Sequence, residues 1–440
     1  MIEQQVAYLQ NLTQQVRHID LRKHFGRLTN IDANCLHALI PDASRGDFCT
    51  VARREGPPLL AEVAGLEGRT ATLVPYGSTD GLSIGAIVRP SRQNLSIKVG
   101  MGMLGRIVNP LGTPLGGTSS LSGKTYDVPV RRSAPDAMDR PLINSPLVTG
   151  LNAIDGPLTL GHGQRVGVFG PPGAGKSRLM ADIVRNAQVD VIVVALVGER
   201  GREVREFVEK DLPANKRQKT ILVVATSDRP STERAICADS ATAIAEWLRD
   251  QGLSVLLMVD SLTRTARALR EIGLAAGEAP TRRGYPSSVY PALPALIERA
   301  GRAGKGSISA IYTVLVEGDG EGDPIAEEVR SLTDGHIILS GSLAEAGHFP
   351  AIDVTRSLSR SMPSFVTAQH LEDASMLRKL LGKYADIEVL LQIGEYSAGS
   401  DTLADHAIRA KPAIDAFLRG SNAAGTTLDT IMSQMKKALL

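Results

Sequence analysis

The chain has 440 residues, of which 43% are hydrophobic and 22% are charged, values that are ordinary for a globular protein. A net charge of +2 and an aromatic content of 4% argue against a nucleic-acid-binding protein that relies on a strong positive field or on stacking platforms. Three isolated cysteines without a CxxC pair fit a reducing cytoplasm, no apolar run approaches the ~20 residues of a transmembrane helix, and no secretory signal is visible. The composition therefore predicts a cytoplasmic protein of roughly two to four domains.

The first 20 residues carry an apolar stripe with helical spacing, at positions 2, 6, 9, 12, 16 and 19. Such a stripe is typical of a helix that caps its own domain, and equally of a helix that docks into a groove on a partner. The pattern alone leaves both interpretations open.

Between residues 26 and 91 the pattern changes to short β-like runs at 35–40, 58–63, 70–74 and 86–88, separated by turn clusters. Regular short strands of this kind indicate a small barrel. Residues 92–150 are rich in Gly and Pro, and we interpret them as a long connection with a short helix or strand.

From about residue 151 to residue 365 apolar runs alternate with amphipathic helices. Near-continuous apolar runs are typical of parallel strands that are buried on both faces. The predicted strands are 166–169, 191–197, 221–225, 255–259, 310–316 and 336–339. After residues 362–363, helical spacing at 368–384, 401–420 and 427–440 predicts a helical end of the chain.

Residues 170–177 match the phosphate-binding pattern G-x-x-x-x-G-K-[ST] at every fixed position, between a predicted strand and a helix-compatible run. Glycines let backbone N–H groups wrap around an anion, and the following helix adds the positive end of its dipole. We expect Lys176 to reach the β- and γ-phosphates of a nucleoside triphosphate and the Ser177 hydroxyl to ligate Mg²⁺. The predicted nucleotide-binding residues are Gly170, Pro171, Pro172, Gly173, Ala174, Gly175, Lys176, Ser177 and Arg178.

A carboxylate follows the strand predicted at 255–259. Burying Asp260 at the tip of an apolar strand is costly unless a charged partner is present, and in P-loop enzymes this position serves the Mg²⁺ shell. The alternative is a helix N-cap for the run that follows.

The strand predicted at 191–197 is also followed by charged residues. ATP hydrolysis needs a group that orients and partly deprotonates water, and Glu199 is the candidate, with Arg200 holding it or a neighbour. By chemistry alone, a cluster of exposed surface charges is an equally good interpretation.

These same residues carry a family resemblance. The string GERGREVREF at 198–207 resembles the ATPase of type III protein export, found in flagella and in injectisomes, and more broadly the catalytic subunits of rotary-type hexameric ATPases. Strings at 225–230, 260–264, 270–278, 312–319 and 393–396 agree. The resemblance covers about residues 26–420.

The resemblance implies an α/β fold with a central RecA-like P-loop ATPase domain and a mostly parallel sheet, a small N-terminal β-barrel and a C-terminal helical domain. The implied parts are a regulator-binding helix, the barrel, the ATPase domain and the helical domain, at residues 1–25, 26–95, 96–365 and 366–440. It further implies Mg²⁺-dependent ATP hydrolysis in a homohexamer, with Glu199 and Lys176 as catalytic residues.

Two residues are singled out by the resemblance alone. Phe349 aligns with an aromatic residue that packs on adenine, although an ordinary core aromatic is the alternative. Arg360 aligns with an arginine finger that reaches a neighbouring subunit's γ-phosphate, and Arg356, one helical turn earlier, is its rival.

The resemblance also implies partners. They are a stator-like regulator at the N-terminal helix, a central stalk protein in the pore, and export chaperone–substrate complexes at the C-terminal domain, with the ring peripheral to the inner membrane export gate. Motif likeness favours an injectisome over a flagellum. Two departures from the family pattern are the extra glycines at 318–324, a region near the pore, and the pair Pro171 and Pro172.

Three other functions fit parts of the sequence. A ring-shaped RNA translocase shares the nucleotide core, but the weak net charge and scarce aromatics count against nucleic acid as a partner. A non-catalytic ring subunit would lack the carboxylate at Glu199. A rotary ATP synthase catalytic subunit fits the string around Arg202 less well than an export ATPase does.

Overall fold

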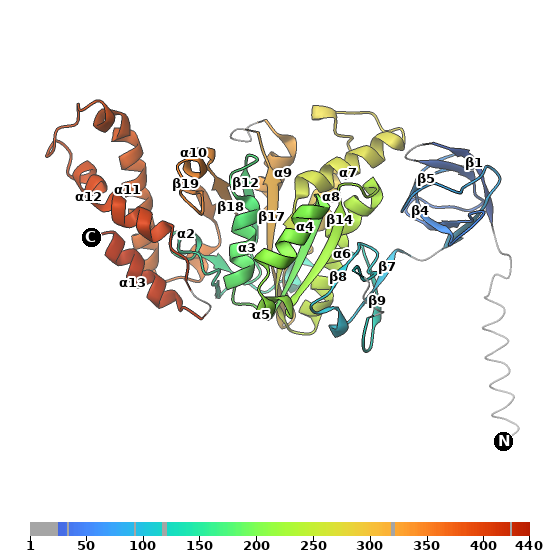
Figure 1. Ribbon diagram of the computed structural model, residues 1–440, viewed down its shortest axis with the longest axis horizontal. Coiled ribbons are helices and arrows are strands. Elements are labelled where there is room, and N and C mark those ends of the chain that lie inside the picture. Colours follow the sequence, from blue (N-terminus) through green and yellow to red (C-terminus); the bar gives the residue numbers. More distant parts are fainter. Residues whose placement is uncertain (1–24, 33–34, 92–93, 117–120, 318–321, 423–424) are drawn as a thin grey trace, which may run out of the picture. The chain divides into compact units, whose positions relative to one another are not determined.

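The computed structural model describes residues 25–32, 35–91, 94–116, 121–317, 322–422 and 425–440 (Figure 1). The chain forms two compact units, Met1–Asn94 and Leu95–Leu440. The helix predicted at residues 1–20 and most of the glycine-rich segment at 318–324 lie outside the described residues. None of the described helices combines the length and apolarity needed to cross a bilayer.

The first unit contains a closed antiparallel barrel of six strands in the order β1-β2-β5-β4-β3-β6, which confirms the predicted barrel. Its interior is filled by apolar side chains that alternate along the strands, such as Leu36 and Ala38 of β2. The sequence pattern did not predict strand β1. Within this strand, Leu28 is the one large apolar side chain that is fully buried, so there is no apolar run to detect. The strands are β1 Gly26–Ile31, β2 Leu36–Leu39, β3 Phe48–Val51, β4 Leu59–Glu67, β5 Thr70–Pro75 and β6 Ile87–Ser91.

The second unit begins with the Gly/Pro-rich connection. Here β7 (Ser96–Val99) pairs with β9 (Tyr126–Pro129), and β10 (Pro146–Leu147) pairs with β11 (Leu160–Gly161). The short strand β8 (Ile107–Val108) pairs in parallel with β14 and forms one edge of the central sheet. The short 3-10 turns of this unit are η1 Met101–Met103, η2 Ala137–Asp139, η4 Arg282–Gly284 and η5 Met362–Ser364.

The central sheet has the order β19-β18-β12-β17-β15-β13-β14-β8, with the short β16 (Gly301–Ala303) beside β17. All six predicted strands are present and parallel to one another. An antiparallel edge strand was not anticipated, because polar residues alternate with apolar ones along β19. The strands are β12 Arg165–Gly170, β13 Val191–Glu199, β14 Thr220–Thr226, β15 Ser254–Asp260, β17 Gly306–Leu315, β18 Gly335–Leu339 and β19 Ile352–Ser359.

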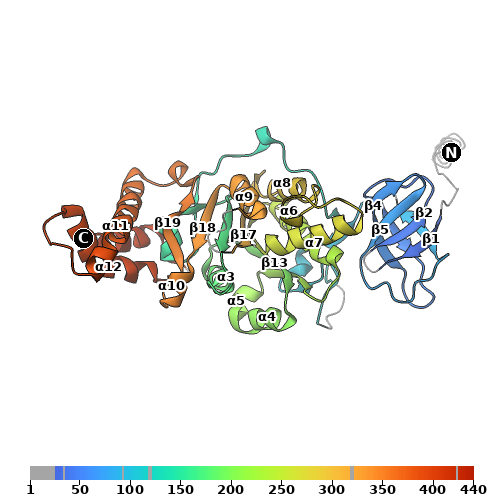
Figure 2. The same cartoon turned by 90° about the horizontal axis from the view of Figure 1, so that it is seen from above.

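Both faces of the sheet are buried, as the apolar runs predicted. On β13, Ile192 and Val194 belong to the cluster under α3, whereas Val191 and Val193 belong to the cluster under α6. Seen from above, α3 and α4 lie on one side of the sheet and α8 and α9 on the other (Figure 2). The helices are α3 Lys176–Asn186, α4 Gly201–Glu206, the π-helical η3 Phe207–Asp211, α5 Ala214–Arg217, α6 Ser231–Asp250, α7 Leu262–Ala275, α8 Val289–Ile297, α9 Pro324–Leu332 and α10 Gly341–Glu345.

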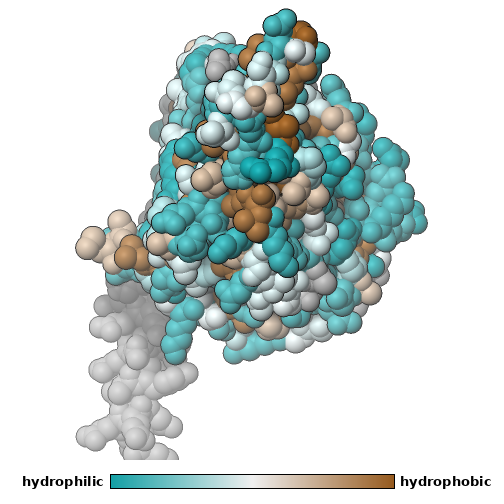
Figure 3. Space-filling model, turned by 90° about the vertical axis from the view of Figure 1, so that its left-hand side faces the viewer, coloured by the Kyte–Doolittle hydropathy of each residue, from teal (hydrophilic) through white to brown (hydrophobic). Residues whose placement is uncertain are grey.

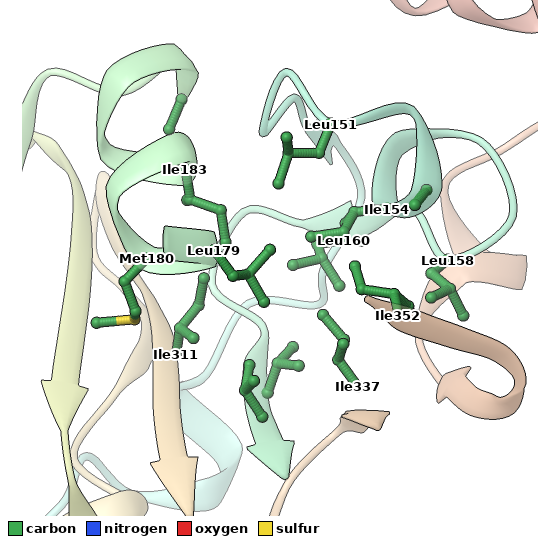
Figure 4. Packing of buried hydrophobic residues seen from close by; sticks show 14 of the residues in the cluster. Leu151, Ile154, Leu158, Leu160, Leu179, Met180, Ile183, Ile311, Ile337 and Ile352 are labelled. Atoms are coloured by element: carbon green, nitrogen blue, oxygen red, sulfur yellow. The ribbon is translucent and has the colours of Figure 1, made fainter. Parts of the chain in front are cut away.

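The helix after the phosphate loop is anchored by this core. Leu179 and Ile183 of α3 point toward Leu160, Ile337 of β18 and Ile352 of β19 (Figure 4). Because these contacts hold α3 against the sheet, the N-terminus of α3 is fixed at the carboxyl end of β12.

The chain ends in three helices, as predicted, namely α11 (Ala368–Gln392), α12 (Thr402–Leu418) and α13 (Leu428–Ala438), each started by a side-chain N-cap from Thr367, Asp401 or Thr427. They share a hydrophobic core with α2 (Asn152–Asp155) of the same unit. The domain boundaries at residues 95 and 365 stay predictions.

Candidate functional site

The phosphate loop connects β12 to α3 in the predicted strand–loop–helix arrangement. Gly173 and Gly175 have φ values of +84° and +85°, a left-handed conformation that glycine adopts without strain. A Cβ on Gly175 would also lie 3.1 Å from Cε1 of Phe349. The glycine at this position therefore allows the loop both to turn and to accept an aromatic ring against its backbone.

The Lys176 side chain is buried and lies against its own loop. Its Nζ donates hydrogen bonds of 2.6 Å to the carbonyl oxygens of Gly170 and Pro171. Burial lowers the pKa of Lys176 to about 8, and Asp260 and Glu199 act in the opposite direction. Both carboxylates are thus close enough to interact with this ammonium group electrostatically.

Asp260 ends β15 and is buried at the carboxyl edge of the sheet. Its Oδ1 accepts a hydrogen bond of 2.6 Å from the Thr313 hydroxyl on the neighbouring strand β17. Burial raises the pKa of Asp260, whereas Thr313, Arg264 and Lys176 stabilise its charged form. The helix N-cap at this point is Ser261, which accepts from the Arg264 amide, so the capping alternative for Asp260 is wrong.

Glu199 ends β13, two strands away from β17, and its carboxylate faces Arg264 of α7 at 2.7 Å. Burial raises the pKa of Glu199 to about 7, helped by a hydrogen bond with Glu203 and the charge of Asp260, while Arg264 lowers it. A carboxylate with such a pKa is suited to accept a proton near neutral pH. The interpretation as exposed surface charge does not hold for Glu199, whose side chain is 14% exposed.

Arg200 does not contact Glu199 in this arrangement. Its side chain is 76% exposed and pairs with Glu203 at 3.6 Å. Arg264, and not Arg200, is the residue that contacts the Glu199 carboxylate, and the supporting role of Arg200 stays a prediction.

Phe349 lies beside the phosphate loop rather than in the core. Its ring touches the Gly175 position, and the guanidinium carbon of Arg178 lies 4.6 Å from the ring centroid. A half-buried ring next to the loop is where a stacking partner for a base would be expected.

Arg360 directly follows the last residue of β19, at the end of this strand that lies farther from the phosphate loop. In the pairing of β18 with β19, Leu339 faces Ile352, whereas Gly335 faces Ser359. Leu339 is the residue that adjoins the phosphate loop, since a Cβ on Gly170 would lie 2.8 Å from it. The strand end next to Arg360 is therefore four residues of β18, roughly 13 Å, away from the strand end next to the phosphate loop.

The exposed Arg360 guanidinium donates to the carbonyl oxygens of Thr333 at 3.2 Å and Arg330 at 3.5 Å, which keeps it away from the chain's own phosphate loop. Arg356 is also exposed and lies on β19. The expectation of a helical turn between the two arginines is wrong, because this segment is an extended strand.

Sequence reasoning assigned no role to Arg264 or Thr313. Arg264 belongs to the string at 260–264 and lies on the first turn of α7, four residues after Asp260. This closeness to Asp260 is the feature of the sequence that could have indicated a role for Arg264 in the site. Thr313 sits in a buried strand with no local sign of its partner.

Comparison with known proteins agrees with this arrangement. Residues 150–359 match the ATP synthase alpha/beta family nucleotide-binding domain, 42–92 its beta-barrel domain, and 366–437 the T3SS EscN ATPase C-terminal domain. The "Type 3 secretion system ATPase" of Sinorhizobium fredii is 49% identical over 94% of this chain and 92% of its own length. The chain belongs to the type III secretion ATPase family.

Other members of this family are similar over most of their length. The "SPI-2 type 3 secretion system ATPase" of Salmonella typhimurium is 47% identical, covering 90% of each chain, and the "Flagellum-specific ATP synthase" of Bacillus subtilis is 43% identical, covering 93% and 94%. The solved structure of the assembled ATPase EscN from enteropathogenic E. coli superposes with a TM-score of 0.89 at 43% identity, covering 94% of this chain and all of that one. EscN has also been solved in complex with its central stalk EscO, with a TM-score of 0.87 at 42% identity and the same coverage.

The pairing of Glu199 with Arg264 predicts a pH effect for this ATPase. If Glu199 must be deprotonated to accept a proton, hydrolysis rises as pH increases through about 7 and is lost below it. Arg264→Gln removes the cation that lowers the pKa of Glu199, so the acid limb of the kcat profile should move to higher pH.

Arg267→Gln is the matched control, because Arg267 is an exposed arginine on the same helix α7. Hydrolysis rates measured across the acid and neutral range on both sides of the Glu199 pKa check the prediction. An acid limb at the same pH in wild type and Arg264→Gln would contradict it.

Proposed function

We propose that this chain is the Mg²⁺-ATP-hydrolysing motor of an injectisome-type secretion system, which releases chaperones from export substrates and unfolds those substrates. The observation that carries the proposal is the grouping of Lys176, Asp260 and Glu199 at the carboxyl ends of β12, β15 and β13, where Lys176 and Asp260 are buried and the Glu199 side chain is 14% exposed.

The loop residues fit a nucleotide. Gly170–Ser177 supplies the backbone cradle, and Lys176 can exchange its bonds to Gly170 and Pro171 for phosphate oxygens. Phe349, with Arg178 stacked against it, would pack on the adenine ring. Pro171 and Pro172 fall at positions that the pattern leaves free.

The donors present also fit Mg²⁺. The Ser177 hydroxyl at the start of α3 and the Asp260 carboxylate are hard oxygen ligands, which this cation prefers. Thr313 orients the carboxylate of Asp260. When bound, Mg²⁺ supplies positive charge to the phosphate oxygens.

Glu199 is the group that would orient the attacking water and take its proton, while Arg264 fixes the position of its carboxylate. Arg200 would act on Glu199 indirectly. It pairs with Glu203, and Glu203 shares a hydrogen bond with Glu199. Lys176 would stabilise charge that develops on the transferred phosphoryl group.

A homohexamer is supported by the position of Arg360. Because this arginine is held at the opposite strand end from its own phosphate loop, it would complete the site of a neighbouring subunit. Head-to-tail contacts of this kind close into a ring. The similar ATPase EscN has been solved in its assembled form and in complex with its central stalk, which supports a ring and a stalk partner for this chain.

The C-terminal helices support a docking role for chaperone–substrate complexes. Val389, Leu390 and Ile393 near the end of α11 share a helix face, and Val389 and Ile393 are 64% and 63% exposed. Figure 3, which views the molecule from the side of the C-terminal helices, shows apolar patches among polar surface. Exposed apolar groups of this kind mark sites for partner proteins.

Two further partners are proposed on the family resemblance. A stator-like regulator would bind the helix predicted within residues 1–25, and the ring would sit peripherally at the inner membrane export gate. The injectisome assignment is supported by identities of 49% and 47% to ATPases named for type 3 secretion, against 43% for the flagellum-specific relative.

The test is a chromosomal Glu199→Gln replacement in the bacterium that encodes the chain. We expect type III substrates to disappear from the culture medium, as measured by mass spectrometry, while swimming motility is unchanged. The control is Glu209→Gln, because Glu209 is an exposed glutamate 57% accessible to solvent and paired with Arg205. Loss of motility instead would assign the chain to flagellar export, and normal secretion and motility would refute the proposed function.

A further inference from the structure

Among the described residues, one group of three metal-ligand side chains from His, Cys, Asp and Glu has its donor atoms within 4.8 Å of one another. It is formed by Asp32, Cys35 and His37 at the hairpin between β1 and β2, in the barrel unit. The group lies in the barrel unit, outside residues 150–359 and 42–92 that match the two ATP synthase alpha/beta family domains.

The three donor atoms form a compact triangle. Asp32 Oδ2 lies 3.2 Å from His37 Nε2 and 3.7 Å from Cys35 Sγ, and Sγ lies 3.8 Å from Nε2. Around a tetrahedral Zn²⁺ with ordinary bond lengths, N and O ligand atoms stand about 3.3 Å apart and S stands about 3.6 Å from either. The observed separations lie within about 0.2 Å of these tetrahedral values, so a zinc ion would need little movement of the ligands.

Neighbouring strands already hold two of the ligands. The other ring nitrogen of His37, Nδ1, lies 3.4 Å from the Thr72 hydroxyl on β5, which leaves Nε2 to face the cluster. The Asn30 amide on β1 donates to both oxygens of Asp32 at 3.1 and 3.2 Å. Hydrogen bonds of this kind to the ligands themselves orient them in metal sites.

Burial differs across the group. Cys35 is buried, whereas the side chains of Asp32 and His37 are 50% and 31% exposed. Solvent therefore has access to the group on the side of Asp32, where a water molecule can serve as a fourth ligand.

We propose that Asp32, Cys35 and His37 form a zinc site that clamps the β1–β2 hairpin of the barrel. The ligands are one thiolate, one imidazole and one carboxylate, a set suited to Zn²⁺ and poorly suited to Mg²⁺ or Ca²⁺. The clamp joins the two ends of the hairpin turn and stabilises the barrel locally.

The test uses the full-length chain, stripped with a chelator and dialysed against micromolar Zn²⁺ in the presence of millimolar Mg²⁺ and ATP. We expect about one Zn²⁺ per chain by elemental analysis. Cys35→Ser and His37→Gln should each lose it, while Cys49→Ser, which removes another buried cysteine of the same barrel, should keep it. Circular dichroism checks that each variant is folded.

A second measurement replaces zinc with Co²⁺. The wild type and Cys49→Ser should show a thiolate-to-cobalt charge-transfer band, and Cys35→Ser should not. Failure of the wild type to retain zinc would overturn the proposal, and so would equal retention by Cys35→Ser and His37→Gln.

Discussion

Arg360→Ala should lower the rate of ATP hydrolysis per subunit by about 10³–10⁵-fold, the effect expected for loss of an arginine finger. Nucleotide binding should stay within a few-fold of wild type, because Arg360 is held by the carbonyls of Thr333 and Arg330 and not by its own phosphate loop. The variant should also fold normally, since the side chain is exposed. Hydrolysis and fluorescent-nucleotide titration measure the two effects separately.

Arg356→Ala is the matched control, because Arg356 is a second exposed arginine on the same edge of the sheet. If Arg360 is the finger, Arg356→Ala should keep most of the activity. The opposite result, an active Arg360→Ala and an inactive Arg356→Ala, would show that Arg356 is the arginine finger.

A mixing experiment tests whether the arginine acts in trans. Subunits with Arg360→Ala keep an intact Glu199, and subunits with Glu199→Gln keep an intact Arg360. If each site takes its finger from a neighbour, a random 1:1 mixture in closed rings should recover about a quarter of wild-type activity. A mixture as inactive as its two components would show that both residues serve the same subunit's site.

Glu199→Gln is the second large effect. The change keeps the size of the side chain and an oxygen for Arg264, but it removes the group whose pKa of about 7 allows it to take a proton from water. We expect kcat to fall by about 10²–10⁴-fold, in the range for loss of a general base. The affinity for ATP should change little, because the phosphate loop and Lys176 are untouched.

The control for this variant is Glu203→Gln. Glu203 shares a hydrogen bond with Glu199 but lies at the more exposed side of the pair. Its replacement should alter the rate much less than Glu199→Gln does. Equal losses in both variants would mean that the two carboxyls act as a unit, and an active Glu199→Gln would remove Glu199 from the mechanism.

Much of the site was predictable because its pieces are local. Gly173, Gly175 and Lys176 lie in one short loop, and Glu199 and Asp260 each follow an apolar run that could only be a buried strand. In an open α/β sheet the carboxyl ends of parallel strands share one edge, so the order of these residues along the chain was enough to place them at the same edge.

The partners of these residues were not predictable. Thr313 holds Asp260 from 53 residues away, and the contact exists because β15 and β17 happen to be neighbours in the sheet. Strand order depends on which hydrophobic faces pair across the whole domain, and no local periodicity encodes it. The same reason explains why Arg264, and not the adjacent Arg200, holds Glu199.

The sequence alone therefore determined the phosphate loop, the two carboxylates at the carboxyl edge of the sheet and the succession of barrel, parallel sheet and helices, because each depends on short-range pattern. Only the tertiary structure decided which side chains meet across strands, such as Phe349 against Gly175. It also decided that Arg360 is held away from its own site, because the antiparallel course of β19 carries the chain from the phosphate-loop end of the sheet to the opposite end.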